Sequence, residues 1–256
     1  MVLDAGTLRV WTGPGWQLRR DGVPRVVVEH GGRPADALAA VLGDLPRARL
    51  SMQNRLQIIV GYPWTHCVVV PWQDGVLSAS AWDAYARSLF AARAQRGALR
   101  IRIEDAPYGR ARLAVAACEA TLEALADVSR AAGWRTVSCR DALSASLCTH
   151  GRRLVGDDYR FALLQPRVGT CLFRHAGEWA DAITLPRLGG GHIEEWLTAA
   201  ALMGGQRATD VVYASTFGVS VPLLDMAGVT LLDGMPAELP ELPELAGAAP
   251  SAEGGA

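Results

Sequence analysis

The alternation of hydrophobic and polar residues predicts a mixture of strands and helices along most of the chain. Continuous apolar runs at 56–61 (LQIIVG) and 65–72 (THCVVVPW) are typical of buried strands, whereas apolar residues recur at helical spacing within 80–96. Apolar and polar residues alternate at 99–105 and 111–117, and the Pro-Tyr-Gly sequence between these runs favours a turn. We therefore expect these last two strands to form a β-hairpin.

The other elements of the first 150 residues begin and end at recognisable signals. A Gly-Pro-Gly turn joins two predicted strands, Pro34 stands in the first turn of a helix, Gly133 follows the end of another, and Asp141 is placed to cap a third. Strands are thus predicted at 7–12, 16–20, 24–29 and 134–139, and helices at 34–42, 119–132 and 141–148.

The second part of the chain has a similar order of elements. Strands are predicted at 159–165, 168–174, 178–184, 210–214 and 229–232, and helices at 192–203 and 219–226. This order is βββαβαβ, and the first part shows a related order when residues 62–105 are treated as an insertion. The sequence therefore predicts an α/β protein with two βββαβαβ repeats, residues 1–150 and 151–234, each with a mixed sheet flanked by helices.

Residues 235–256 differ in composition from the rest of the chain. They are rich in Pro, Ala, Gly and Glu, lack aromatic and β-branched residues, and contain acids but no base. Such a segment does not bury enough apolar surface to offset the entropy lost on ordering, so we expect a disordered acidic tail. The repeated sequence ELPELPEL leaves one alternative, a short docking motif.

Composition and charge exclude several classes of protein. The 256 residues include 25 basic and 26 acidic ones, and every basic residue is Arg. The balanced charge gives no long-range attraction to nucleic acid or to an anionic membrane, and the lack of Lys excludes a phosphate-loop or Schiff-base lysine. The five cysteines and five histidines are widely spaced, so neither a metal site nor a disulfide framework is predicted.

The chain also lacks the pattern of a signal peptide and any apolar run of about 18 residues, the length that a spanning helix needs. We therefore expect a soluble cytoplasmic protein that does not insert into the membrane.

Four stretches resemble one known family. VLDAGTLRV at 2–10 is similar to an Asp-x-Gly phosphate turn followed by a strand, and residues 161–179 stand where a second phosphate hairpin is found. Residues 119–149 resemble the segment before the second repeat, and 185–197 the entry to the interdomain helix. With the twofold element order, these stretches resemble the actin-like ATPase superfamily of ribonuclease-H-like repeats. Within it they resemble the PilM-type pilus assembly proteins and the cytoplasmic domain of the type II secretion protein GspL, over residues 2–233.

This resemblance implies a nucleotide site, but the chain differs from the family's pattern at the positions that would bind the nucleotide. Gln165 and Pro166 replace an acid in the second hairpin, and Phe217 stands where small glycines would receive adenosine. Acidic residues hold Mg²⁺ beside the phosphates in such sites. We therefore expect no catalytic residue, no metal and no cofactor, with residual ATP binding or ATPase activity as the alternative. The resemblance assigns Asp4, Gly6, Thr7, Gly169, Thr170 and Gly218 to the vestigial site.

The inserted segment supplies the candidate partner-binding residues. Trp64 and Trp72 flank prolines outside both predicted repeats, and exposed tryptophans are enriched at binding surfaces. An ordinary lid that packs on the insertion helix is the alternative. The strand 99–105 offers an edge for an added strand, through Leu99, Ile101 and Ile103.

The resemblance implies a non-enzymatic cytoplasmic scaffold of a type IV pilus or a type II secretion system. Such a scaffold is expected to be recruited to the inner membrane face, where it binds a cytoplasmic segment of an inner-membrane partner or a motor ATPase. No nucleic-acid partner is expected. An interaction module unrelated to envelope machinery is a third alternative.

Overall fold

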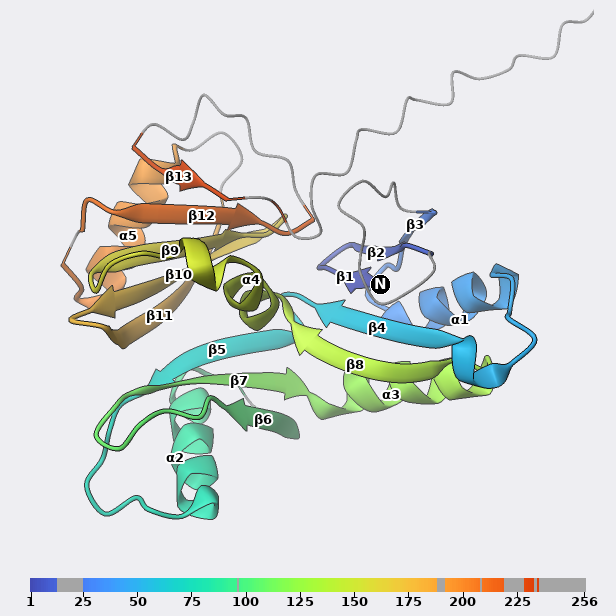
Figure 1. Ribbon diagram of the computed structural model, residues 1–256, viewed down its shortest axis with the longest axis horizontal. Helices are drawn as coiled ribbons and strands as arrows, with labels where there is room; N and C mark the ends of the chain where they lie inside the picture. Colours follow the sequence, from blue (N-terminus) through green and yellow to red (C-terminus); the bar gives the residue numbers. More distant parts are fainter. Residues whose placement is uncertain are drawn as a thin grey trace, which may run out of the picture.

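The computed structural model contains two five-stranded sheets, a three-stranded sheet and α-helices between and around them (Figure 1). It describes residues 1–12, 25–95, 97–187, 192–207, 209–218, 228–232 and 234. The predicted strand at 16–20, the helix at 219–226 and the tail at 235–256 lie outside these residues.

The first large sheet has the strand order β3-β2-β1-β4-β8. Its strands are β1 (Val2–Leu3), β2 (Thr7–Val10), β3 (Val26–Glu29), β4 (Arg55–Val60) and β8 (Arg135–Asp141). β1, β2 and β3 form an antiparallel meander, whereas β4 and β8 run parallel to β1. The two-residue central strand β1 was not predicted, because the hydrophobic pattern begins its first strand at Thr7.

The second large sheet has the corresponding order, β11-β10-β9-β12-β13. Its strands are β9 (Tyr159–Leu164), β10 (Val168–His175), β11 (Glu178–Pro186), β12 (Val212–Thr216) and β13 (Thr230–Leu231). Again three strands form an antiparallel meander and two run parallel to its first strand. Because the helix predicted between β12 and β13 lies outside the described residues, the complete βββαβαβ repeat stays a prediction.

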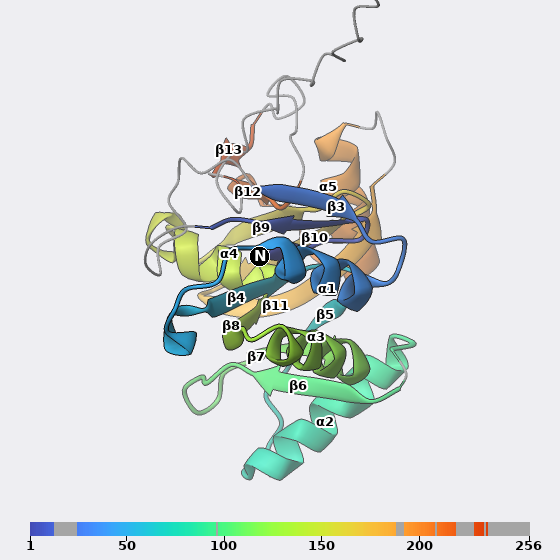
Figure 2. The same ribbon diagram turned by 90° about the vertical axis from the view of Figure 1, so that its right-hand side faces the viewer.

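Helices cover the sheets through apolar stripes. α1 (Pro34–Asp44) and α3 (Glu119–Ala131) pack together on the first sheet (Figure 2), and α5 (Ile193–Gly204) packs on the second. α4 (Ala142–His150) contributes to the core that lies between the two sheets. Two short 3₁₀ turns, Ser51–Gln53 and Gly151–Arg153, complete the described elements.

The inserted segment forms its own small unit. β5 (Thr65–Val70), α2 (Ala79–Ala92), β6 (Leu99–Ile103) and β7 (Arg112–Cys118) build the sheet β5-β7-β6 and the helix that covers it. The predicted hairpin between β6 and β7 is confirmed. Since β7 pairs with β5 and β6 and with neither large sheet, this unit extends to Cys118, beyond the predicted 62–105. We call it the insertion unit.

Three side-chain contacts fasten the insertion unit to strand β11 of the second sheet. The guanidinium of Arg93 lies 2.8 Å from Asp181 Oδ1, the guanidinium of Arg110 pairs with the carboxylate of Glu178, and the Trp179 indole donates to Glu104 Oε2 at 3.0 Å. The insertion unit therefore links the two halves of the chain instead of projecting freely from the first.

Candidate functional site

The two large sheets meet where their parallel strands end. β1, β4 and β8 run in the same direction, so their carboxyl ends share one edge of the first sheet, and the ends of β9 and β12 face that edge. A Cβ atom placed on Gly61, the residue after β4, would lie 2.4 Å from Gln165 Oε1 and 2.7 Å from Phe217 Cε1. Only glycine therefore allows this close approach.

Gln165 and Phe217 fill the junction between the sheets. Phe217 is fully buried in the core between them, and the Gln165 side chain accepts a hydrogen bond from the Tyr62 backbone N–H at 2.8 Å. The two substitutions that the sequence flagged as chemically unsuitable for a nucleotide site thus lie side by side against Gly61 and join the halves of the chain.

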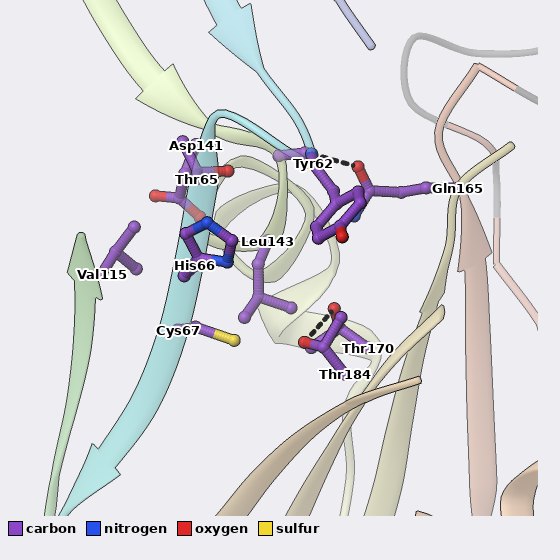
Figure 3. A pocket seen from close by; sticks show the side chains of 11 residues that line it. Tyr62, Thr65, His66, Cys67, Val115, Asp141, Leu143, Gln165, Thr170 and Thr184 are labelled. Atoms are coloured by element: carbon purple, nitrogen blue, oxygen red, sulfur yellow. Dashed lines mark hydrogen bonds between the residues drawn. The ribbon is translucent and has the colours of Figure 1, made fainter. Parts of the chain in front are cut away.

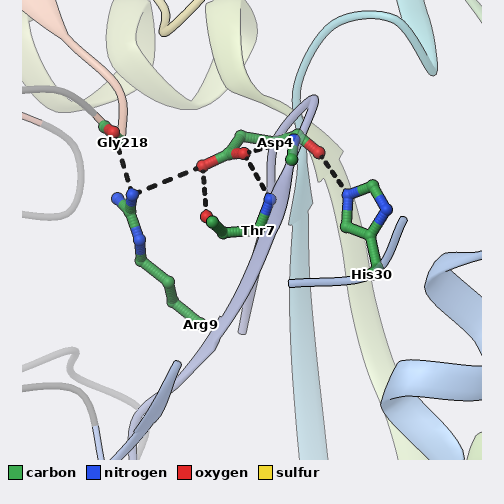
Figure 4. A network of polar contacts seen from close by, with 6 residues as sticks. Asp4, Thr7, Arg9, His30 and Gly218 are labelled. Atoms are coloured by element: carbon green, nitrogen blue, oxygen red, sulfur yellow. Dashed lines mark hydrogen bonds and ion pairs between the residues drawn. The ribbon is translucent and has the colours of Figure 1, made fainter. Parts of the chain in front are cut away.

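The turn between β1 and β2 is organised by the Asp4 carboxylate (Figure 4). Asp4 Oδ1 accepts hydrogen bonds from the backbone N–H groups of Gly6 (2.9 Å) and Thr7 (2.8 Å), and Oδ2 accepts from the Thr7 hydroxyl (2.7 Å). Aspartate commonly stabilises tight turns by such local bonds. His30 Nε2 donates to the Asp4 carbonyl at 2.9 Å, while His30 Nδ1 accepts from the Gly32 N–H.

Arg9 connects this turn to the second sheet. Its guanidinium lies 3.6 Å from Asp4 Oδ2 and donates to the carbonyl of Gly218, at the end of β12, at 3.0 Å. Gly218 has a φ of 71°, and a Cβ there would lie 2.8 Å from Asp4 Oδ2. Both oxygens of the buried Asp4 carboxylate therefore have protein partners, and the Arg9 guanidinium provides the positive charge beside it.

A small cavity lies beside this junction (Figure 3). Its walls include polar side chains from both halves, namely Tyr62, His66, Asp141, Gln165, Thr170 and Thr184. Its volume is about 20 Å³, which is room for one water molecule. Sites for drug-sized ligands usually occupy about 300–1,000 Å³. This cavity therefore has no room for a nucleotide.

Burial sets the charge state of the groups around the cavity. It lowers the pKa of His66 and raises the pKa of the Cys67 thiol to about 12. The pKa of Asp141 is also raised by burial, against the opposing effect of the hydrogen bond from the Ser144 N–H at 2.7 Å. At neutral pH, His66 is therefore uncharged and Cys67 is a thiol, so neither provides an activated nucleophile or a cation for phosphate.

Sequence reasoning assigned Asp141 only to the cap of α4. The structure confirms that cap and also places the carboxylate at the carboxyl end of β8, on the wall of the cavity. The sequence signal that could have predicted this position is an acidic residue between a predicted strand and the helix that follows it. Among the described residues, no group of three or more His, Cys, Asp or Glu is placed to hold a metal ion.

The residues of the predicted vestigial site are only partly brought together. Asp4, Gly6, Thr7 and Gly218 form one network through Arg9. Gly169 instead lies under Trp196 of α5, where a Cβ would be 2.4 Å from the indole ring. The Thr170 hydroxyl lies 3.0 Å from that of Thr184 in the cavity wall.

The predicted partner-binding residues differ in their surroundings. Trp64 packs on the core of the first sheet, with its ring centroid 6.0 Å from that of His30. Trp72 lies at the end of β5, between the exposed Tyr108 ring at 4.4 Å and Trp82 of α2 at 5.6 Å. The side chains of Leu99, Ile101 and Ile103 pack in the core of the insertion unit.

The arrangement of the two sheets is the fold of the actin-like ATPases, which confirms the resemblance predicted from the sequence. One similar solved structure is the PilM-PilN type IV pilus biogenesis complex, with a TM-score of 0.55 and 11% identity over 91% of this chain and 87% of that one. Another is a Bacteroides thetaiotaomicron protein with an actin-like ATPase fold and unknown function, with a TM-score of 0.53 and 7% identity over 83% and 82% of the two chains.

The cytoplasmic domain of EpsL, an inner-membrane component of the type II secretion system of Vibrio cholerae, matches with a TM-score of 0.46 and 10% identity over 85% and 77% of the two chains. No protein-family model and no curated protein matches the sequence of this chain. Among the described helices, none has the length and apolar character required to cross a membrane.

Proposed function

We propose that this protein is a non-enzymatic scaffold that works without nucleotide in a type IV pilus or type II secretion assembly, and that it binds a cytoplasmic segment of an inner-membrane partner. The observation that supports the proposal is the packing of the junction between the two sheets. Gln165 and Phe217 meet Gly61 there, and Arg9 lies beside Asp4 and donates to the Gly218 carbonyl. The likeness in fold to a chain of the PilM-PilN type IV pilus biogenesis complex supports the proposal of a role in pilus assembly.

Fixed contacts between the halves suit such a role. Arg9 joins β2 to the end of β12, Gln165 joins the second sheet to Tyr62, and Arg93 joins the insertion unit to β11. A nucleotide-driven machine needs its halves to move when the nucleotide changes. We propose that this chain instead presents its surfaces in one constant arrangement.

The partner surface that we propose is the free edge of β6. The backbone bonds Glu104 N–H to Leu113 O and Glu119 N–H to Ala98 O fix which residues of β6 bond to β7. In an antiparallel ladder these residues alternate, so Ile101 and Ile103 direct their N–H and C=O groups away from β7. An extended segment can add to such an edge as a further strand.

The surroundings of this edge favour an acidic extended segment. Arg100 and Arg102 are exposed on β6, and no ion pair to Arg102 is formed by the described residues, although Arg100 pairs with Glu119 of α3. At the end of the insertion unit, the exposed ring of Tyr108 and the half-buried ring of Trp72 extend the surface with aromatic area. We propose Trp72 as the aromatic anchor, since Trp64 belongs to the core of the first sheet.

Photo-crosslinking in cells tests this surface. With a photoreactive amino acid in place of Arg102, we expect a crosslink to an inner-membrane protein of a pilus or secretion assembly, and none with the same group in place of the exposed Met52. Ile101→Pro should lower the yield at least about tenfold, because it removes the outward N–H without removing a bond to β7. Ile101→Val keeps this N–H and should retain the crosslink.

The melting temperature separates an effect of Ile101→Pro on partner binding from an effect on folding. If Ile101→Pro keeps the wild-type melting temperature and the wild-type crosslink, the edge of β6 is not the binding surface. Equal crosslinking from positions 102 and 52 would mean that the insertion unit has no specific partner.

A further inference from the structure

A second and larger groove lies where three parts of the chain meet. Its volume is about 330 Å³, and its walls come from the β6–β7 hairpin (Glu104), from α4 and the segment after it (Leu147, Leu154) and from the second sheet (Tyr159, Arg174, Trp179). We call it the α4 groove. It is separate from the small cavity beside the junction, since the two sets of lining residues share no member.

Arg174 gives the α4 groove its chemical character. Its guanidinium lies 5.0 Å from the ring centroid of Trp179 and 5.7 Å from that of Tyr159. Its Nε atom is buried without a hydrogen-bond partner, and none of the described carboxylates forms an ion pair with it. Glu104, the acid on the opposite wall, already accepts from the Trp179 indole and the Leu113 N–H. A guanidinium held between aromatic rings selects a carboxylate attached to an apolar group.

The tail of the chain contains several carboxylates that are each next to an apolar side chain. Glu238, Glu241 and Glu244 are each followed by leucine, so each offers a carboxylate next to an isobutyl group. The segment 235–256 has four acids and no base, whereas the rest of the chain has 25 basic and 22 acidic residues. Prolines between the Glu-Leu pairs restrict the free chain, which lowers the entropy lost on binding.

The last described strand, β13, belongs to the sheet that forms one wall of the α4 groove. Thr230 of β13 pairs with Tyr213 of β12, and the Tyr213 hydroxyl bonds to the backbone of Val155, in the segment that lines the groove. The Tyr213 ring centroid is also 5.6 Å from that of Tyr159 in the groove wall. β13 runs parallel to β12 and β9, from the end of the sheet near Tyr159 toward the end near Gln165, so the tail would have to turn back to reach the groove. An extended chain advances about 3.1 Å per residue, and the 22 residues of the tail are long enough for this path.

We propose that the Glu-Leu-Pro repeat at 238–245 binds in the α4 groove of its own chain. One glutamate pairs with Arg174, and the neighbouring leucine packs against Leu147, Leu154 and the Trp179 ring. The tail then covers Cys148, an exposed free cysteine on the wall of the groove.

Alkylation of the full-length protein, mapped by mass spectrometry, tests the proposal. Cys139 is a second exposed cysteine, on β8 and outside the groove, and serves as the internal reference. In a tail variant with Glu238→Gln, Glu241→Gln and Glu244→Gln, we expect Cys148 to react at least about fivefold faster than in the wild type, with Cys139 unchanged, because the tail's effective concentration is lost from the groove. The three substitutions change no residue that lines the groove.

Arg174→Gln should raise the reactivity of Cys148 to the same extent, and combining it with the tail variant should add nothing further. Equal reactivity of Cys148 in the wild type and the tail variant overturns the proposal. A wild-type rate that rises on dilution of the protein would place the tail in the groove of a second copy, which contradicts binding within one chain.

Discussion

Asp4→Ala is expected to lower the free energy of unfolding by about 3 kcal/mol, one of the two largest effects that we predict. The substitution removes the acceptor of three hydrogen bonds in the β1–β2 turn and leaves the Arg9 guanidinium without its carboxylate. Asp4 is 1% exposed and Arg9 is 15% exposed, so water does not replace these partners easily. Denaturant unfolding of the wild type and the variant measures the difference.

Asp36→Ala is the matched control for this variant. Asp36 also pairs with an arginine, Arg33, but both side chains are largely exposed, so its loss should cost well under about 1 kcal/mol. If Asp4→Ala is no more harmful than Asp36→Ala, the Asp4 network does not hold the junction together.

Phe217→Ala should lower the free energy of unfolding by about 3–5 kcal/mol, because it leaves a cavity between the two sheets. Gly61→Ala should also destabilise, since its new Cβ has no space beside Phe217 and Gln165. The penalty for Gly61→Ala should then shrink in the Phe217→Ala background, where the Phe217 ring no longer opposes the Cβ. A double-mutant cycle in denaturant gives this coupling.

Phe90→Ala provides the comparison for that cycle. Phe90 is equally buried, but it lies in the core of the insertion unit, so its removal should destabilise without changing the penalty for Gly61→Ala. Additive losses for Phe217→Ala and Gly61→Ala would mean that these two residues do not meet across the junction.

Local patterns in the sequence were sufficient for most elements of the fold. The alternation at 99–105 and 111–117 predicted the β6–β7 hairpin, because a short turn brings neighbouring strands together whatever the rest of the chain does. Conversely, β1 has only two residues and no pattern of its own, and it is a strand only because β2 and β4 pair with it on either side. The extent of the insertion unit was likewise underestimated, since β7 was not recognised as a partner of β5.

The candidate site was predictable in its residue types but not in its contacts. The glutamine, proline and phenylalanine at 165, 166 and 217 led to the prediction that the chain does not hydrolyse ATP. The packing of the two sheets brings Gln165 and Phe217 against Gly61, and it brings Arg9 to Gly218. No pattern within a short stretch of sequence predicts how two sheets pack. The same limit explains why Trp64, with prolines nearby, packs on the first sheet rather than standing free.

The measurement that tests the central claim most directly is a titration of the full-length protein with Mg-ATP, followed by calorimetry and by the melting temperature. Arg9, Gln165 and Phe217 occupy the junction, so millimolar Mg-ATP should produce no binding heat and leave the melting temperature unchanged. A ligand at 100 times its dissociation constant adds about 2.7 kcal/mol to the stability of the folded state, an effect that is easily measured. A saturable heat with a rise in melting temperature would contradict a scaffold that works without nucleotide, and would identify the protein as an ATP-binding member of this fold.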